Sequence, residues 1–347
     1  MTTYFVDPVS GSDAAAGTSF GAAFATTQKG FDTLASGDEL RLCQTGVESI
    51  SAPIDLDGTS GAATGFTDVI SYNAAGTTPS DGYKIQAASA IDEMITIHET
   101  PDYWRFRGFT LDGNSNAVTG LQNNSSSVDE CDYAGWLNVV FENMTGNGCR
   151  VSGTAPNYFI GCIARNNGAH GFAAHGNQRG KLRLIGCVSH GNTNSGIVLQ
   201  YNGDSFAHRC LIYDNGDYGI QAWSSIQILE VFGNTIADNG NHGLFLNGTA
   251  GFQTIAHNLI VGNGTGGSGY GIKQNAAGQV IHVHNNNFYG NQDGDSDQVL
   301  PGENFSTNPS LDSEYRATVT IEGPSGILIG ALAPASGGGS TVIVIDD

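Results

Sequence analysis

Residues 210–223 read CLIYDNGDYGIQAW, and 24 positions later residues 234–247 read NTIADNGNHGLFLN. Both segments contain an Asp-Asn-Gly triplet and, at the same offset, a second Gly that precedes an apolar residue. Self-similarity at a period of about 20 to 50 residues is typical of solenoids, in which each repeat stacks on the one before it. The chain is therefore expected to be a repeat structure.

The same register extends through the second half of the chain. A first column comprises Asn138, Cys162, Cys187, Cys210, Asn234, Asn258 and Asn286, at intervals of 24, 25, 23, 24, 24 and 28 residues. A second column, five residues later, comprises Asn143, Asn167, Asn192, Asn215, Asn239, Asn263 and Asn291. The long last interval contains four extra residues before Gly271, so the register survives the insertion.

Apolar residues alternate with other residues inside each repeat, as in residues 182–184 (LRL) and 197–199 (IVL). Alternation indicates strands with one buried face, and it does not suit helices. Three short strands and three turns in about 24 residues, with turns about 4.8 Å apart, would bury every inward side chain against its equivalents. We therefore predict an all-β, single-stranded parallel β-helix of about 24 residues per turn with a capped N-terminus.

The columns have a structural interpretation. Buried Asn side chains at one turn of successive repeats can hydrogen-bond along the stack, and this structural ladder is predicted for Asn167, Asn192, Asn215, Asn239 and Asn263. Cys162, Cys187 and Cys210 are expected to pack as small buried fillers, with disulfide or metal roles as the weaker alternatives. The Gly four residues after each ladder Asn is expected to adopt a backbone conformation that a side chain would forbid.

The composition excludes some functions. The 347 residues include 13 Lys and Arg against 33 Asp and Glu, a formal charge of -20 at pH 7. The average field repels phosphate backbones and anionic membranes, so neither nucleic acid nor membrane is an expected partner. Acidic polysaccharides would be repelled unless cations or a basic patch intervened. Residues 1–8 lack the pattern of a standard signal peptide, although a mature secreted chain with a new Met would look the same.

The chain divides into four predicted parts. Residues 1–46 form an N-terminal cap and the first turn of the coil, with a helix over residues 24–34, and residues 47–300 form the β-helix. Residues 301–335 form a closing segment. Residues 336–347 form a Gly-rich hinge and a β-prone tail that either pairs with the edge of a neighbouring chain or folds back on its own chain.

The opening segment and the Asn-Gly-x-x-Gly-Ile type of repeat resemble those of the pectate-lyase-like superfamily of right-handed parallel β-helices. The resemblance covers roughly residues 4–300 and implies the fold and its right-handed coil, not an activity. No motif of a characterised lyase, hydrolase or epimerase family transfers to this chain residue by residue.

Stacking would turn each outward position of the repeat into a file of side chains on the surface. Planar aromatic rings suit the apolar faces of sugars, and amides suit their hydroxyl groups. The predicted carbohydrate-binding residues are His175, Gln200, Tyr218, Gln221, Trp223, Phe245 and Lys273. An ordinary polar surface or a subunit interface is the competing interpretation.

Asp214 and Asp238 are one repeat apart in the same column, so they are expected to be stacked neighbours, with His242 nearby. Close carboxylates can form the acid and base of a glycosidase, and these three residues are the candidate catalytic group. The alternatives are a Ca²⁺ site that includes Asp217, and simple turn formation by Asp-Asn-Gly, which the pattern favours. No other cofactor is predicted.

The resemblance and the whole-chain solenoid lead to three hypotheses. The first is a bacteriophage virion protein, a spike or head-decoration protein, that contacts cell-surface or environmental polysaccharide. It would be a homotrimer or bound to other virion proteins, and located in the virion or outside the cell. The second is a polysaccharide lyase or glycoside hydrolase of the same fold. The third is a purely structural decoration protein.

Overall fold

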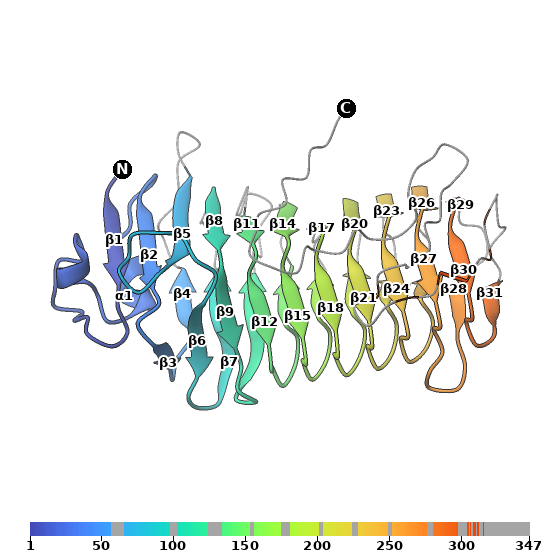
Figure 1. Ribbon diagram of the computed structural model, residues 1–347, viewed down its shortest axis with the longest axis horizontal. Coiled ribbons are helices and arrows are strands. Elements are labelled where there is room, and N and C mark those ends of the chain that lie inside the picture. Colours follow the sequence, from blue (N-terminus) through green and yellow to red (C-terminus); the bar gives the residue numbers. More distant parts are fainter. Residues whose placement is uncertain are drawn as a thin grey trace.

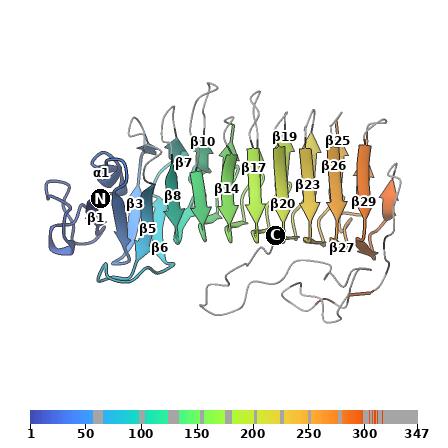
Figure 2. The ribbon, with the colours of Figure 1, turned by 90° about the horizontal axis from the view of Figure 1, so that it is seen from above.

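The computed structural model describes residues 1–56, 66–97, 103–123, 134–152, 156–174, 181–200, 204–223, 228–248, 252–275 and 280–297, together with residues 304, 306, 308, 309, 311 and 315. In these residues the chain winds into a coil of parallel strands stacked along one long axis (Figures 1 and 2). The predicted all-β parallel β-helix is confirmed. No helix in the described ranges is long and apolar enough to cross a membrane.

Three parallel sheets form the walls of the coil, and each turn adds one strand to each sheet. Sheet A contains β1 (Thr3–Val6), β2 (Glu39–Cys43), β5 (Thr67–Tyr72), β8 (Trp104–Arg107), β11 (Ala134–Leu137), β14 (Pro156–Ile160), β17 (Lys181–Ile185), β20 (Asp204–His208), β23 (Ile228–Phe232), β26 (Phe252–Ala256) and β29 (Val280–His284). Sheet B contains β3 (Val47–Ile50), β6 (Tyr83–Ala87), β9 (Phe109–Asp112), β12 (Val140–Glu142), β15 (Ile163–Arg165), β18 (Val188–His190), β21 (Leu211–Tyr213), β24 (Thr235–Ala237), β27 (Leu259–Val261) and β30 (Asn287–Tyr289). Sheet C contains β4 (Ile54–Leu56), β7 (Ile91–Ile97), β10 (Ala117–Asn123), β13 (Cys149–Val151), β16 (Phe172–Ala174), β19 (Ile197–Gln200), β22 (Ile220–Trp223), β25 (Leu244–Asn247), β28 (Tyr270–Gln274) and β31 (Gly294–Asp297).

The N-terminal end of the coil carries a short helix, α1 (Thr27–Phe31), after the 3-10 turn η1 (Phe20–Ala22). The helix is shorter than the predicted span of residues 24–34. Phe24 instead hydrogen-bonds the backbone of Phe5 in β1, and Thr26 caps the helix by accepting from the Lys29 N–H. Phe24 and Leu34 are nevertheless buried, so both join the core from outside the helix.

The asparagine ladder is present in the predicted register. The Asn215 side chain donates to Asn239 Oδ1 at 3.0 Å, and the Asn239 side chain donates to Asn263 Oδ1 at 2.9 Å. Asn167 and Asn192 continue the chain of hydrogen bonds in the other direction. A second ladder links Asn234, Asn258 and Asn286 at the turn between sheets A and B. These bonds satisfy amide groups that would be costly to bury alone.

The first members of both predicted columns are one residue out of register. Asn138 and Asn143 have positive φ angles of 50° and 58°, so they occupy the turn position before the ladder. Val139 and Met144 hold the ladder positions instead. The Val139 carbonyl accepts from Ile163 N–H, and the Met144 N–H donates to Asn167 Oδ1. Asn tolerates the left-handed conformation better than most residues, which explains why it also occurs at the turn position.

The repeat glycines have a different role from the one predicted. Gly196, Gly219 and Gly243 do not have positive φ angles. A Cβ at Gly219 would instead lie 2.6 Å from the Ile236 side chain and 2.7 Å from the Gly243 carbonyl oxygen. The positive φ angles occur at the residue before each ladder Asn, for example 64° at Gly191. These positions therefore require glycine because successive turns of the coil pack closely there, and not because of the backbone conformation.

The cysteines behave as predicted for buried packing residues. Cys43, Cys149, Cys162, Cys187 and Cys210 are all buried and form no disulfide, whereas Cys131 lies outside the described residues. The thiols of Cys162 and Cys187 also donate to the carbonyl oxygens of Trp136 and Phe159, each at 3.2 Å. Burial raises the pKa of Cys187 well above its usual value, so this thiol stays protonated and unreactive.

Candidate functional site

The outer face of sheet C displays the predicted files of side chains. Gln200, Trp223 and Asn247 are aligned across β19, β22 and β25. A parallel file runs through Ala173, Val198, Gln221, Phe245 and Lys273. The first four of these side chains lie outside the core cluster but are buried, with Gln221 7% and Phe245 8% exposed. Strand alternation places these residues outward because their neighbours, such as Ile220 and Ala222, belong to the core. His175 lies outside the described residues.

A third file lies on the turn that enters sheet C. Backbone hydrogen bonds from successive glycines reach the carbonyls of Ser195, Tyr218, His242 and Tyr270, so these residues stand one above the next. His170 precedes them in the same file, because the Gly148 N–H donates to its carbonyl. The tight glycine turn thus sets the aromatic residues beside the outer face of the sheet.

Aromatic rings from two of the files form one cluster. The rings of Tyr218 and Phe245 stack at 4.7 Å, and those of Tyr218 and His242 stack at 5.6 Å. His242 also contacts Tyr270 at 5.9 Å, and the Lys273 ammonium lies 5.2 Å from the Tyr270 ring centre. We call Gln200, Tyr218, Gln221, Trp223, His242, Phe245, Tyr270 and Lys273 the sheet C stripe. It combines planar apolar faces with hydrogen-bonding groups along a line.

The backbone fixes the state of His242. Its Nδ1 accepts a hydrogen bond from the Tyr270 N–H at 2.9 Å, so in the neutral ring the proton is on Nε2. Burial lowers the pKa of His242 and the Lys273 ammonium lowers it further, whereas Asp293 and Asp217 act in the opposite direction. His242 is therefore a neutral side chain whose Nε2–H can donate to a ligand.

Asp214 and Asp238 are at equivalent turn positions one repeat apart, each with a φ of 51°. The Tyr315 hydroxyl donates to Asp214 Oδ1 at 3.1 Å, and the Tyr315 ring stacks on Tyr213 at 4.2 Å. Burial raises the pKa of Asp238, and the charge of Asp214 raises it further, while the Tyr315 hydroxyl lowers it. Tyr315, a residue from outside the repeat, therefore contacts this carboxylate pair.

His242 does not join the two carboxylates. Its ring contacts are with Tyr218, Phe245 and Tyr270 in the sheet C stripe. The left-handed φ angles of Asp214 and Asp238 are those expected of turn residues. The catalytic role of the pair stays a prediction, and Asp238→Asn tests it, because an acid–base pair would lose its activity and a turn residue would not.

We expect Tyr315→Phe to weaken the contact between residue 315 and Asp214. The substitution keeps the stack on Tyr213 and removes the hydroxyl that donates to Asp214. Loss of one hydrogen bond to a charged group costs about 1.5 to 3 kcal/mol when the bond is shielded and less at this exposed site. Hydrogen exchange in a peptide spanning residues 311–315 should become a few-fold faster. Tyr289→Phe, at another exposed tyrosine, is the control and should change nothing.

The described residues offer no support for calcium at the aspartates. Asp217 Oδ1 accepts from the Asn241 side chain at 2.6 Å, while Asp214 accepts from Tyr315. Within the described ranges, no group of three or more His, Cys, Asp or Glu side chains is arranged to hold a metal ion. The Ca²⁺ site suggested at Asp214, Asp217 and Asp238 stays a prediction.

One polar cluster on sheet B was not predicted. The Lys84 ammonium lies 3.0 Å from both Asp112 Oδ2 and Glu142 Oε1, and Arg165 binds Glu142 through two nitrogens. Burial favours a higher pKa for Asp112, but hydrogen bonds from Asn143, Gln86 and Lys84 outweigh it and lower the pKa to about 2. Every carboxylate oxygen has a partner, so we interpret the cluster as structural.

Asp112→Asn should give a destabilisation that depends on pH. Because the pKa of Asp112 is lowered by folding, its contribution is complete above the unfolded value of about 3.9 and is lost as the pH falls toward 2. We expect a loss of about 2 kcal/mol at pH 7 that shrinks to about a third of that value at pH 2.5, above the folded pKa, measured by urea unfolding. Asp92→Asn, at an exposed carboxylate, should show no such difference.

A second unpredicted surface lies on the outer face of sheet A. The Arg183 guanidinium lies 5.0 Å from the Tyr158 ring centre and 5.6 Å from that of Phe206, and Phe206 stacks on His208. Phe252, farther along this sheet, is 63% exposed. These residues lie on the strands that precede each Cys or Asn of the first column. Extending the repeat register to those strands would have predicted this surface from the sequence.

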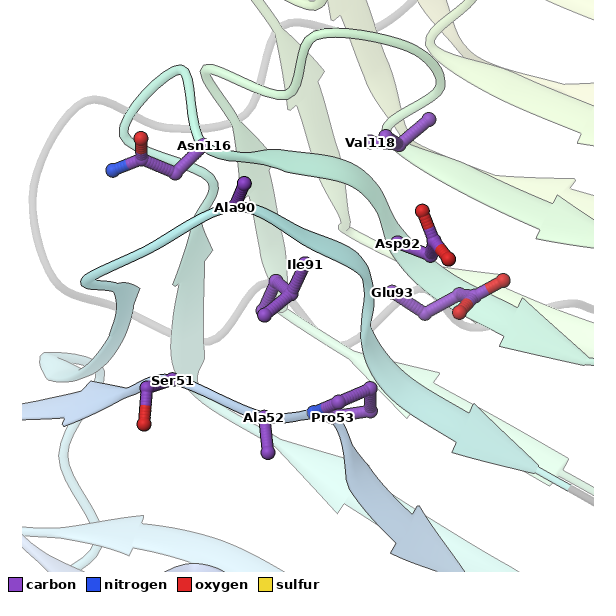
Figure 3. Close-up of a pocket in the computed structure, with 9 residues that line it drawn as sticks. All are labelled: Ser51, Ala52, Pro53, Ala90, Ile91, Asp92, Glu93, Asn116 and Val118. Atoms are coloured by element: carbon purple, nitrogen blue, oxygen red, sulfur yellow. The ribbon is translucent and has the colours of Figure 1, made fainter.

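A cavity of about 420 Å³ lies apart from all predicted files, near the N-terminal end of sheet C (Figure 3). It is lined by Ser51, Ala52, Pro53, Ala90, Ile91, Asp92, Glu93, Asn116 and Val118. Its charged residues are two carboxylates on β7, and no aromatic ring lines it. It therefore lacks the stacking surface that the sheet C stripe offers.

Comparison with known proteins bears on the fold. The family model described as a right-handed β-helix region matches residues 123–288. Pectate lyase Pel9A has a similar structure, with 17% identity, a TM-score of 0.63, and coverage of 92% of this chain and 82% of that chain. The A-module of mannuronan C-5 epimerase AlgE6 from Azotobacter vinelandii gives 18% identity, a TM-score of 0.50, and coverage of 73% and 71%. No curated protein sequence gave a match. The chain is a right-handed parallel β-helix with a fold like that of pectate lyase Pel9A.

Proposed function

We propose that this protein is a carbohydrate-active β-helix that holds an extended polysaccharide along the sheet C stripe. The observation that carries the proposal is the exposed ring of Trp223, on the same face as the half-buried rings of Tyr218 and His242, which pack on the buried Phe245. Trp223 is 39% exposed, so part of its indole is accessible to a ligand. Gln200 and Asn247 flank it in the same file and supply amides for sugar hydroxyls.

The geometry suits a linear polymer better than a small ligand. Aligned side chains follow one another at the strand spacing of about 4.8 Å, so a ligand that crosses the strands meets a side chain of each file on each turn of the coil. A compact ligand would instead need a pocket with converging polar groups. The names of the two similar structures, a pectate lyase and a mannuronan epimerase, support a polysaccharide as the ligand class.

Trp223→Ala should weaken binding of the polysaccharide about tenfold or more. Stacking of an aromatic ring on a sugar is lost, whereas the fold should survive because the side chain is partly exposed. Affinity electrophoresis of the purified protein in gels that contain individual polysaccharides measures the effect. Phe252→Ala removes a more exposed ring from sheet A and is the matched control. Equal retardation of wild type and Trp223→Ala by every bound polysaccharide would contradict the assignment.

A lyase or hydrolase activity is the more specific form of this proposal. Product analysis after incubation with pectate, alginate, capsular and neutral polysaccharides would detect it. Unsaturated ends would indicate a lyase, and new reducing ends without unsaturation would indicate a hydrolase. If Asp214 and Asp238 are the acid and base, Asp238→Asn abolishes the products and leaves affinity unchanged.

A virion-associated role, as a phage spike or head-decoration protein, is the other candidate. Parallel β-helices that bind polysaccharide without cleaving it would use the same surface, and the β-prone tail of residues 336–347, which lies outside the described residues, would serve assembly. This role predicts a homotrimer and a location in the virion or outside the cell. Light scattering distinguishes it, because a stable monomer of 36.1 kDa would argue against the trimer.

A further inference from the structure

The charge of the sheet C stripe limits which polysaccharide it can accept. Lys273 is the cation of the stripe, and its ammonium is 3.1 Å from Asp297 Oδ2 in the neighbouring strand. The same ammonium lies over the Tyr270 ring. The positive charge is therefore already neutralised within the protein.

Further carboxylates surround the aromatic cluster. Asp217 and Asp293 lie close enough to His242 to influence its proton affinity, as does Asp297. Asp217 accepts from the Asn241 amide and Asp293 from the Gly269 N–H, and no cation is paired with either in the bonds of this turn. Three carboxylates thus oppose one ammonium around His242.

The remaining groups of the stripe carry no positive charge. His242 is neutral because its Nδ1 accepts the Tyr270 N–H, and burial favours that state. Arg150 lies in the same file as Gln221 but three strands away, beyond Val198 and Ala173. The aromatic end of the stripe therefore has a negative local field on a chain of formal charge -20.

We propose that the polysaccharide held by the sheet C stripe is an uncharged hexose polymer and not a polyuronate. This inference rests on the proposed function and names its substrate class. A polyuronate would place a carboxylate on every sugar beside Asp217, Asp293 and Asp297, and none of the stripe residues that the structure describes offers a free cation there to receive it. An uncharged polymer needs only ring stacking and hydrogen bonds from groups such as His242 Nε2–H and the Gln200 amide.

The test compares purified wild-type protein with neutral and acidic polymers of matched length. Galactomannan, mixed-linkage glucan and dextran serve as neutral probes, and polygalacturonate and alginate as acidic probes, each with and without Ca²⁺ and at low and high salt. We expect at least one neutral polymer to bind at least fivefold more tightly than either polyuronate, with little dependence on salt. Trp223→Ala should weaken that binding.

Asp297→Asn is the decisive variant because it frees Lys273 from its ion pair. Affinity for the polyuronates should rise at least fivefold, and affinity for the neutral polymer should stay the same. Asp295→Asn changes the total charge equally in the same strand without touching Lys273, and it is the control.

The outcomes separate the two proposals. Polyuronate binding that equals or exceeds neutral binding and depends on Trp223 overturns the neutral class and leaves the proposed function standing. Tighter binding of a cationic, deacetylated chitin than of any neutral polymer also overturns it. Binding of none of the polymers by the folded protein overturns the proposed function itself.

Discussion

Asn239→Asp will destabilise the protein by about 3 to 5 kcal/mol at pH 7, although it replaces only the side-chain NH₂ group by an oxygen. Asn239 is fully buried, and its Nδ2 donates to Asn263 Oδ1 at 2.9 Å and to the Ile212 carbonyl. An Asp at this position would set an acceptor oxygen against two other acceptors and bury a negative charge. The urea midpoint of unfolding should fall accordingly.

The pH dependence identifies the cause. A buried Asp in the ladder has a folded-state pKa above its unfolded value of about 3.9, so its penalty is greatest above the folded pKa and shrinks as the pH falls toward the unfolded value. A protonated Asp can donate one hydrogen bond and partly restores the ladder. Asn275→Asp, at an exposed amide of sheet C, is the matched control and should cost little. A loss of stability that is the same at pH 4 and pH 7 would count against the ladder explanation.

The ladder was predictable from sequence because one physical requirement recurs at every turn of the coil. Buried amides satisfy each other only when they stack, so the Asn column repeats with the period of the backbone. The register was wrong by one residue at Asn138 and Asn143, because Asn also suits the left-handed turn position next to the ladder. A single residue type thus serves two adjacent positions, and spacing alone cannot separate them.

The files of the sheet C stripe were also predictable, since alternation and register place Gln221, Trp223 and Phe245 without any further information. The grouping of His242 with the aspartates was not supported, because the turn directs His242 toward Tyr218 and Phe245. The contact of Tyr315 with Asp214 could not be predicted, because it joins positions 101 residues apart outside the repeat.

Gly219→Ala should destabilise the protein by about 2 to 3 kcal/mol, through overpacking and not through backbone strain. The added methyl group would meet the Ile236 side chain at 2.6 Å, the Gly243 carbonyl at 2.7 Å and the Asn239 amide at 2.9 Å. All three atoms belong to the next turn of the coil, and the Asn239 amide is also part of the ladder. Neither the turn nor the ladder can move without losing hydrogen bonds, so the structure cannot relax cheaply.

Gly135→Ala is the matched control for this explanation. Gly135 is a buried strand glycine of β11 whose added Cβ would find its nearest atoms at 3.9 Å, an ordinary contact distance. Removing a glycine there restricts the unfolded chain and should leave stability unchanged or slightly higher. The difference between the urea midpoints of the two variants therefore measures the cost of placing a methyl group between successive turns of the coil. Equal midpoints for the two variants would mean that the coil can expand locally to admit the methyl group. The vertical files on which the sheet C stripe depends would then be less rigid than the structure implies.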